Sequence, residues 1–559
     1  MLRSPSMSTD PYSGVLNPLV LESAQRFEHI LARAIARLTS LEKWMIVLGV
    51  SLATGIELGT QVAVNVILVD MKGNVAASQD QISWVIIVYS AAFFSVLPLT
   101  DWFARRLSHR KYIVASLLLY ATGAFGCFLS HSLWELLVAR AIMGLGGGAF
   151  LVRGLITLYR FYDPQHRRMA LLTFALFVTS SRALMPVLFG IVTDLGTWNL
   201  AFLVLVPLAM IAAAFLYASL PRGIEFDAGP PNVDSFGTVC LVTGLIAFQV
   251  VMSRGEQDMW FQSGLISFMA IICILSLAVF VWWDTHPANS NPLLNLRVLL
   301  ADSALATGIG VAAILGALLA AGLYLLPLFL RQIQGYSATQ TSWFFCVDGF
   351  STLLGIIAAV KLMQRLTPRG VVLAGLSANV AANVLFVFTL TPDTPALNLC
   401  AILVLHGFSL GMLLPGVTNV LVGHAHFRYI AFAMTIYYTF RQLGGAIGVA
   451  ATVALLDIRE TLHSGRLLDT ANRLNPIVGD VVRHLGFRLQ AQGLPSNVAH
   501  EGAFRLFQLM VAKQTALLTF IDVFWGLALL GLVGIVLVLI FARSGMTKTV
   551  PVSGISQHY

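Results

Sequence analysis

Residues 44–68 read WMIVLGVSLATGIELGTQVAVNVIL. This apolar run is long enough to cross a bilayer as a tilted helix, which needs about 20 residues. One ionisable residue, Glu57, lies near its middle. Because a carboxylate at that depth costs about 2.5–3.5 kcal/mol on insertion scales, an acid inside a span indicates a functional site. Thr60, Gln61 and Val64 follow at helical spacing, which predicts a partly polar stripe that faces protein or water.

The composition extends this interpretation to the whole chain. Of its 559 residues, 57% are hydrophobic and 11% are charged, and the mean hydropathy is +0.82. Soluble domains carry about 25% charged residues. The net charge of +8 is spread between apolar runs, so we expect no nucleic-acid partner. The five cysteines are isolated in apolar runs, which predicts neither a disulfide framework nor a zinc site.

Fourteen apolar runs predict an all-α, polytopic membrane protein, because helices satisfy their own backbone in lipid. Every second loop is basic, as in RRLSHRK at residues 105–111, so we expect both termini in the cytoplasm. The predicted spans lie near residues 44–69, 82–104, 111–130, 134–158, 168–193, 199–219, 235–253, 262–284, 303–330, 340–362, 371–391, 396–423, 428–456 and 516–542.

The predicted organisation is two six-helix halves with an inserted helix pair. Residues 1–43 form a cytoplasmic tail, in which Ser23–Thr39 is either a membrane-surface helix or an ordinary packing helix. In 457–515 we expect amphipathic helices around Val478–Leu489 and Ala503–Lys513. The other segments are 44–220, the N-terminal half; 221–302, a linker and two inserted helices; 303–456, five helices of the C-terminal half; 457–515, an extracytoplasmic segment; and 516–559, the last helix and a cytoplasmic tail.

Few charged residues interrupt the predicted spans. Arg140 stays charged and therefore needs an anion or a polar cavity beside it. Its expected partner is Glu57, the acid deep in the first half. The two residues either couple proton binding to transport or form a static ion pair that fixes helix packing. The charges inside the spans are Glu57, Arg140, Arg153, Arg182, Asp348, Arg441 and Asp522, the last expected near the outer interface.

Several of these residues are candidates for a central cavity. Arg182 either attracts an anionic substrate group or shapes the cavity beside Pro186, which should kink its span. Asp348 either pairs with Arg441 or serves as a second protonation site. His406 is either titratable near neutrality or a hydrogen-bonded structural residue. The predicted substrate cavity comprises Thr60, Gln61, Arg182, Asp348, His406 and Arg441.

Some apparent motifs do not fit their context. GFSLG at residues 407–411 matches the esterase pattern GxSxG but lies in a predicted helix instead of a strand-to-helix turn. GLGGG at 144–148 lacks the Gly-Lys-Ser/Thr of a nucleotide-binding loop. His424 and His426 have no third ligand in view, so we expect no metal site.

FRQLGGAIGVA at residues 440–450 is the most specific of several matches to one family. The matches occur in the family's order and cover roughly residues 44–545. On these residues the chain resembles the EmrB-like, fourteen-helix drug:proton antiporters of the major facilitator superfamily. The supporting matches are Val64-Asn65-Val66, Pro98-Leu99-Thr100 with Trp102 and Ala104-Arg105-Arg106, Arg140 with Gly144, Pro186 with Gly190, Arg254-Gly255 with Trp260-Phe261, Asn291-Pro292-Leu293 and Gly335-Tyr336-Ser337-Ala338-Thr339.

The resemblance implies the major facilitator fold, alternating access and proton-driven export from a bacterial inner membrane. In Gram-negative relatives it also implies docking to a periplasmic membrane-fusion adaptor and an outer-membrane channel. Arg140 matches the family's fourth-span arginine, linked to proton coupling, and Arg441 matches the thirteenth-span arginine. The implied conformational motifs are Asp101, Arg105 and Arg106 after the second span and Pro186 and Gly190 in the fifth.

The sequence also departs from the family's pattern. Thr60 stands where the first-span aspartate is usual, and Glu57 lies one helical turn earlier, so the carboxylate is either displaced on the same face or coupled differently. Met143 replaces a glutamine. Asp101 and Arg105 replace a glycine and an acid or lysine, and Arg182 and Met185 replace small residues.

The predicted function is proton-coupled efflux of hydrophobic or amphipathic small molecules, as in multidrug resistance. The chain is not expected to be an enzyme or to use a cofactor, because a proton gradient would supply the energy. One alternative is an exporter dedicated to an organic anion or metabolite, which the extra arginines favour. Another is a non-transporting scaffold or sensor whose segment 457–515 binds a partner.

Overall fold

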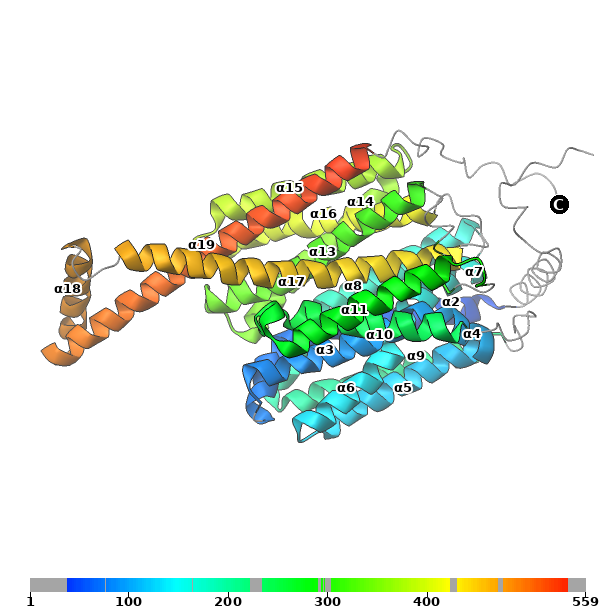
Figure 1. The fold of residues 1–559 in the computed structure, drawn as a ribbon, viewed down its shortest axis with the longest axis horizontal. Helices are drawn as coiled ribbons and strands as arrows, with labels where there is room; N and C mark the ends of the chain where they lie inside the picture. The colour runs from blue at the N-terminus through cyan, green and yellow to red at the C-terminus, as the bar shows by residue number, and fades with distance from the viewer. Residues whose placement is uncertain are drawn as a thin grey trace, which may run out of the picture.

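The computed structural model describes residues 38–75, 77–162, 164–221, 234–289, 293–294, 296, 303–422, 430–470 and 476–540. Within these ranges, 14 helices are long and apolar enough to cross a membrane, as the sequence predicted. They form one elongated bundle (Figure 1). The described residues do not include 23–37 of the expected surface helix, most of the linker, or the histidines at 424 and 426.

The N-terminal half contains two spans that are broken near their middle or end. The second span ends in a 3-10 turn at Pro98, which lacks a backbone donor. The fourth breaks after Gly147, where a Cβ on Gly148 would lie 2.8 Å from the carbonyl oxygen of Phe93. The elements are α2 (Ser40–Asn74), α3 (Gln79–Val96), η1 (Leu97–Leu99), α4 (Thr100–Leu107), α5 (His109–Leu129), α6 (Leu133–Gly147), α7 (Phe150–Phe161), α8 (Pro164–Leu195) and α9 (Trp198–Ser219).

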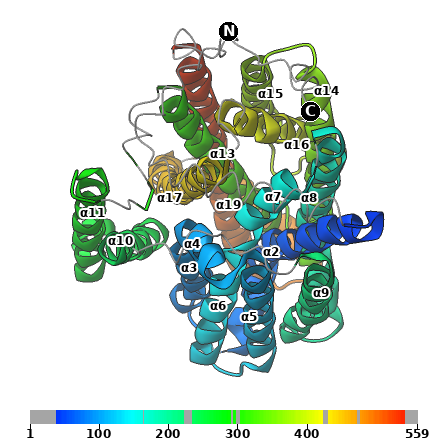
Figure 2. The ribbon, with the colours of Figure 1, turned by 90° about the vertical axis from the view of Figure 1, so that its right-hand side faces the viewer.

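The inserted pair flanks the bundle (Figure 2). It consists of α10 (Ser235–Arg254) and α11 (Gly264–Thr285), with η2 (Trp260–Gln262) between them. α10 packs on α3, whereas α11 packs mainly on α10. Arg254 holds one end through an ion pair of 2.6 Å with Asp258 and a hydrogen bond of 3.2 Å to Ser83. Asp234 holds the other end by accepting the indole N–H of Trp283 at 2.8 Å.

The C-terminal half comprises α13 (Ser303–Gln332), α14 (Ala338–Leu362), α15 (Pro368–Thr389), α16 (Ala396–Val422), α17 (Ile430–Thr470) and α19 (Ser496–Ile540). α14 packs closely on α16, where glycines let the backbones approach. A Cβ on Gly407 would lie 2.2 Å from the carbonyl oxygen of Asp348, and one on Gly411 would lie 2.0 Å from that of Thr352. The GFSLG sequence is therefore a helix-packing element inside α16, as expected.

Segment 457–515 differs in structure from the prediction. α17 continues without a break to Thr470 and α19 begins at Ser496, so both helices project beyond the bundle (Figure 1). The helix expected at 478–489 is α18 (Pro476–Ala491), whereas the one expected at 503–513 is part of α19. Apolar contacts of Val478, Val482 and Ala503 hold α18 on α19. The predicted spans were shorter than α17 and α19 because the residues of 457–515 are polar. Hydropathy indicates which part of a helix can lie in lipid, but it does not indicate where the helix ends.

Candidate transport site

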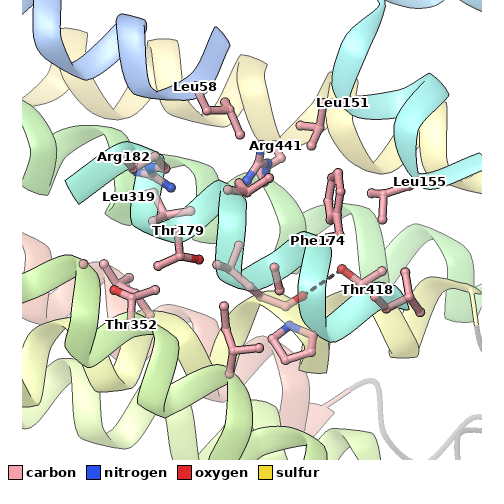
Figure 3. Close-up of a pocket in the computed structure, with 18 of the residues that line it drawn as sticks. Leu58, Leu151, Leu155, Phe174, Thr179, Arg182, Leu319, Thr352, Thr418 and Arg441 are labelled. Atoms are coloured by element: carbon pink, nitrogen blue, oxygen red, sulfur yellow. Dashed lines mark hydrogen bonds between the residues drawn. The ribbon is translucent and has the colours of Figure 1, made fainter. Parts of the chain in front are cut away.

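A cavity of about 770 Å³ lies between the two halves of the bundle. α2, α7 and α8 form one wall, and α13, α14, α16 and α17 form the other. Most of the lining is apolar, with Leu151, Leu155, Phe174 and Leu319 as examples in Figure 3. The volume falls within the roughly 300–1,000 Å³ typical of small-molecule sites.

α8 and α14 contact each other at the end of the bundle that the basic loops assign to the outside. There α8 and α14 are joined by a hydrogen bond from Thr339 to Asp194, and Ser342 donates to the carbonyl oxygen of Pro186 at 3.3 Å. Gly190 lies in the same interface, with its Cβ position 3.7 Å from the Ser342 hydroxyl. At the opposite end the lining includes Arg167, Gln364 and Asn419. The predicted fifth-span motif therefore lies in the contact between α8 and α14.

Glu57 is fully buried in α2. Its Oε1 accepts hydrogen bonds from the hydroxyl of Tyr89, at 3.1 Å, and from the side-chain amide of Gln61. Its Oε2 has no hydrogen-bond partner within the described structure. The carboxyl group is thus held by neutral donors, with one oxygen left free.

The direct ion pair expected between Glu57 and Arg140 is not formed among the residues described. Tyr89 links the two instead, because the guanidinium carbon of Arg140 lies 4.2 Å from the centroid of the Tyr89 ring. Arg140 also donates to the carbonyl oxygen of Val85 at 3.3 Å and contacts the sulfur of Met143 at 3.5 Å. Sequence reasoning missed Tyr89, although a buried phenol usually needs a polar partner.

Thr60 and Gln61 belong to this carboxyl cluster and are not among the residues that line the cavity. Gln61 donates to Glu57, and Thr60 accepts a hydrogen bond of 3.2 Å from Tyr120. The periodicity placed them correctly on the face of Glu57. Periodicity alone could not show whether these two residues lie at a helix interface within one half or in the cavity between the halves.

Arg182 and Arg441 both line the cavity (Figure 3). The guanidinium carbon of Arg441 lies 4.8 Å from the ring centroid of Tyr438, and its Nε has no hydrogen-bond partner in the described part of the chain. Arg182 interacts electrostatically with Arg441, Asp348 and Glu57. These four charged residues belong to four different predicted spans, and in the structure they interact within one region of the bundle.

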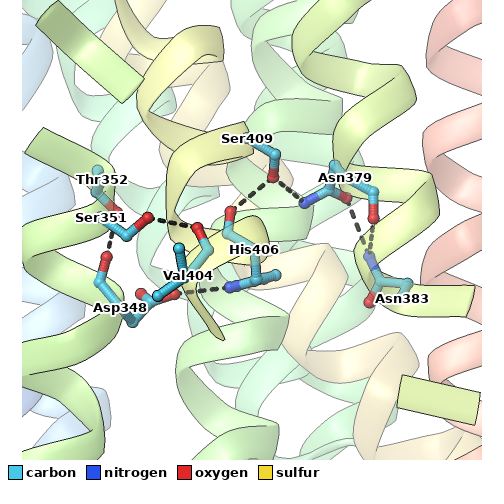
Figure 4. A network of polar contacts seen from close by, with 8 residues as sticks. All are labelled: Asp348, Ser351, Thr352, Asn379, Asn383, Val404, His406 and Ser409. Atoms are coloured by element: carbon cyan, nitrogen blue, oxygen red, sulfur yellow. Dashed lines mark hydrogen bonds and ion pairs between the residues drawn. The ribbon is translucent and has the colours of Figure 1, made fainter. Parts of the chain in front are cut away.

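Asp348 pairs with His406, not with Arg441, as shown in Figure 4. The Nδ1 of His406 lies 2.8 Å from Oδ1 of Asp348, and both residues line the cavity. Hydrogen bonds continue from the His406 carbonyl through Ser409 at 2.6 Å to Asn379 at 3.1 Å. The histidine is therefore hydrogen-bonded, and it also faces the cavity.

The predicted loop motif lies on α4, where the structure describes the side chain of Arg106 but not those of Asp101 and Arg105. Arg106 is exposed, with its guanidinium carbon 5.9 Å from the Trp102 ring centroid. The fully buried Arg153 connects α7 to this corner by donating to the carbonyl oxygen of Thr100 at 3.4 Å. Asp522 joins α19 to α17 through His463 at 2.8 Å, so it is a helix-pairing residue.

The sequence model of the Major Facilitator Superfamily matches residues 50–449. The chain belongs to this superfamily. It is therefore a multi-pass inner-membrane protein of a transporter family, with the fold that the resemblance implied. Among the described residues, no three histidine, cysteine, aspartate or glutamate side chains lie close enough together to hold a metal ion.

Curated relatives of this superfamily member support the EmrB-like resemblance. The chain is 24% identical over 500 residues to the multidrug export protein EmrB of Escherichia coli K12, covering 87% of this chain and 94% of the relative. It is 25% identical over 444 residues to the probable multidrug resistance protein EmrY of the same strain, covering 79% and 86%. The fatty acid resistance protein FarB of Neisseria gonorrhoeae is 25% identical over 455 residues, with the same coverages of 79% and 86%.

Solved structures show the same superfamily fold. A peptide transporter POT in complex with sulfate matches with a TM-score of 0.60 at 14% identity, covering 92% of this chain and 99% of that one. A bacterial homolog of the human lysosomal transporter Spinster matches with a TM-score of 0.52 at 14% identity, covering 91% and 98%.

Proposed function

We propose that this protein is a proton-coupled antiporter that exports hydrophobic or amphipathic small molecules from the cytoplasm. The multidrug export function of EmrB and the largely apolar cavity between the halves support this proposal. The proton gradient supplies the energy, without a cofactor. A transporter that rocks between its halves would break the α8–α14 contact at Asp194 and Thr339 when the cavity turns to the other side.

The observation that carries the proposal is the environment of Glu57. Its carboxyl group is fully buried, is held by the neutral donors Tyr89 and Gln61, and keeps Oε2 free. Such a group can gain and lose a proton without breaking an ion pair. Tyr89 also contacts Arg140, so the charge on Glu57 would be felt by the fourth span.

The test is proton flux in proteoliposomes that contain the full-length protein and a trapped pH indicator. Three probes would be added in turn: naphthalene-1-sulfonate, naphthalene-1-sulfonamide and 1-naphthylmethylammonium. We expect at least one probe to stimulate flux in the wild type and none to do so in Glu57→Gln. Glu501→Gln removes an exposed glutamate of α19 and should behave like the wild type. Wild-type flux in Glu57→Gln would remove Glu57 from the mechanism.

The projecting helices are the proposed docking site for a periplasmic adaptor, and through it an outer-membrane channel. α17, α18 and α19 extend beyond the bundle on the predicted outer side (Figure 1). This arrangement requires both termini in the cytoplasm, as the basic loops indicate. Reporter fusions active only in the cytoplasm should be active at both ends of the chain. Activity at only one end would contradict the proposed orientation.

A further inference from the structure

Two arginines in the cavity have no acidic partner among the described residues. Arg441 is only 7% exposed, and its Nε has no hydrogen-bond partner in the described structure. The partly buried Arg182 forms no hydrogen bond or ion pair with any described residue. The guanidinium groups act electrostatically on each other. Because arginine keeps its charge in proteins, each is a cation in a site of limited hydration.

The nearby acids interact with other side chains. Asp348 is paired with His406 at 2.8 Å, and Glu57 accepts hydrogen bonds from Tyr89 and Gln61. Both acids interact electrostatically with Arg182, but neither forms an ion pair with it. Buried cations without a paired anion are costly, so an anion that enters the cavity would relieve this cost.

The apolar residues of the cavity wall indicate the chemical character of an anion that would fit. Leu151, Leu155, Phe174 and Leu319 line the space beside the arginines (Figure 3). An inorganic ion would leave this apolar surface uncovered, whereas a molecule with an apolar body would cover it. Tyr438 packs on the guanidinium of Arg441 and limits its rotation, which favours a fixed position for the anionic group.

We propose that the cavity binds an amphipathic organic anion, with its acidic group between Arg182 and Arg441 and its apolar body on the leucine-rich wall. The inference deepens the proposed transport function by naming the charge class of the substrate. Arginine suits this role because its planar donors match carboxylate, sulfonate and phosphonate oxygens. The sequence supplies it at position 182, in a stretch where the resembled family uses small residues.

The test is equilibrium binding to the purified full-length protein in lipid nanodiscs. Radiolabelled naphthalene-1-sulfonate is compared with the neutral naphthalene-1-sulfonamide, which has the same apolar body. We expect the anion to bind about tenfold or more tightly than the amide. Arg182→Gln and Arg441→Gln should each weaken anion binding by about tenfold and leave amide binding unchanged. Arg182→Lys should lose less, because the positive charge remains.

Control variants and measurements distinguish loss of the anion-binding site from loss of the folded structure. Arg483→Gln removes an equal charge from the exposed part of α18 and should bind the anion like the wild type. All variants should retain monodisperse elution and helical circular dichroism. Equal binding of anion and amide, tighter binding of 1-naphthylmethylammonium, or absence of saturable anion binding would overturn the proposal.

The outcome of the anion-binding test does not depend on whether the protein couples transport to protons. Glu57→Gln cannot ionise and so cannot place a negative charge near the two arginines, and it should bind the anion at least as tightly as the wild type. If Glu57→Gln binds the anion but wild-type vesicles show no proton flux, the proposed function fails and the anion site stands. If flux is normal and the arginine variants bind normally, the anion site fails alone.

Discussion

The hydroxyl of Tyr89 donates to Glu57 over 3.1 Å, so a side chain of α3 holds the buried acid of α2. The ring of the same tyrosine lies against Arg140 of α6. One residue thus connects the acid and the cation that sequence analysis paired directly. This relationship suggests that the three helices sense the protonation of Glu57 together.

Tyr89→Phe should distinguish the role of the Tyr89 hydroxyl from the role of its aromatic ring. The variant keeps the aromatic contact with Arg140 but leaves Glu57 with Gln61 as its hydrogen-bond donor. Losing a buried hydrogen bond to a charged group costs about 1.5–3 kcal/mol, so we expect proton flux to fall roughly tenfold. The proteoliposome assay measures it. Tyr112→Phe is the matched control, because it removes a buried hydroxyl of α5 that does not hydrogen-bond to Glu57. Equal flux in both variants would contradict the role of Tyr89.

Gly407→Ala should loosen the contact between α14 and α16. The added Cβ would lie 2.2 Å from the carbonyl oxygen of Asp348, so the helices must separate. Overpacking of this kind costs about 1–3 kcal/mol, which should lower the midpoint of thermal denaturation in detergent. Gly465→Ala in α17 is the control, because nothing lies within 4 Å of its Cβ position. It should be neutral or stabilising by up to about 1 kcal/mol. A lower midpoint for Gly465→Ala than for Gly407→Ala would refute this assignment.

A disulfide between positions 194 and 339 should lock α8 against α14. Asp194 and Thr339 contact each other across α8 and α14, so Asp194→Cys with Thr339→Cys brings two thiols together. In a background without the five native cysteines, oxidation should abolish probe-stimulated flux and reduction should restore it. Each single cysteine variant is a control that oxidation should not affect. Transport by the fully oxidised pair would show that this contact does not open during the cycle.

Sequence analysis predicted the parts of this protein that depend on local composition. The fourteen spans and the polar face of Glu57 follow from hydropathy and helical period, which neighbours in the chain decide. The inserted pair was located because its two apolar runs separate two sets of six. These features need no knowledge of how the helices pack.

Only the tertiary structure decided which side chains meet. Tyr89 replaced a direct Glu57–Arg140 ion pair, and His406, not Arg441, became the partner of Asp348. Each of these contacts joins helices whose rotation and crossing are fixed by packing, often at glycines such as Gly407. A shift of one residue along a helix turns a side chain by about 100°, so periodicity alone cannot select a partner on another helix. The sequence therefore determined which charges lie in the membrane, and the packing of the two halves decided which of them remain free to face the cavity.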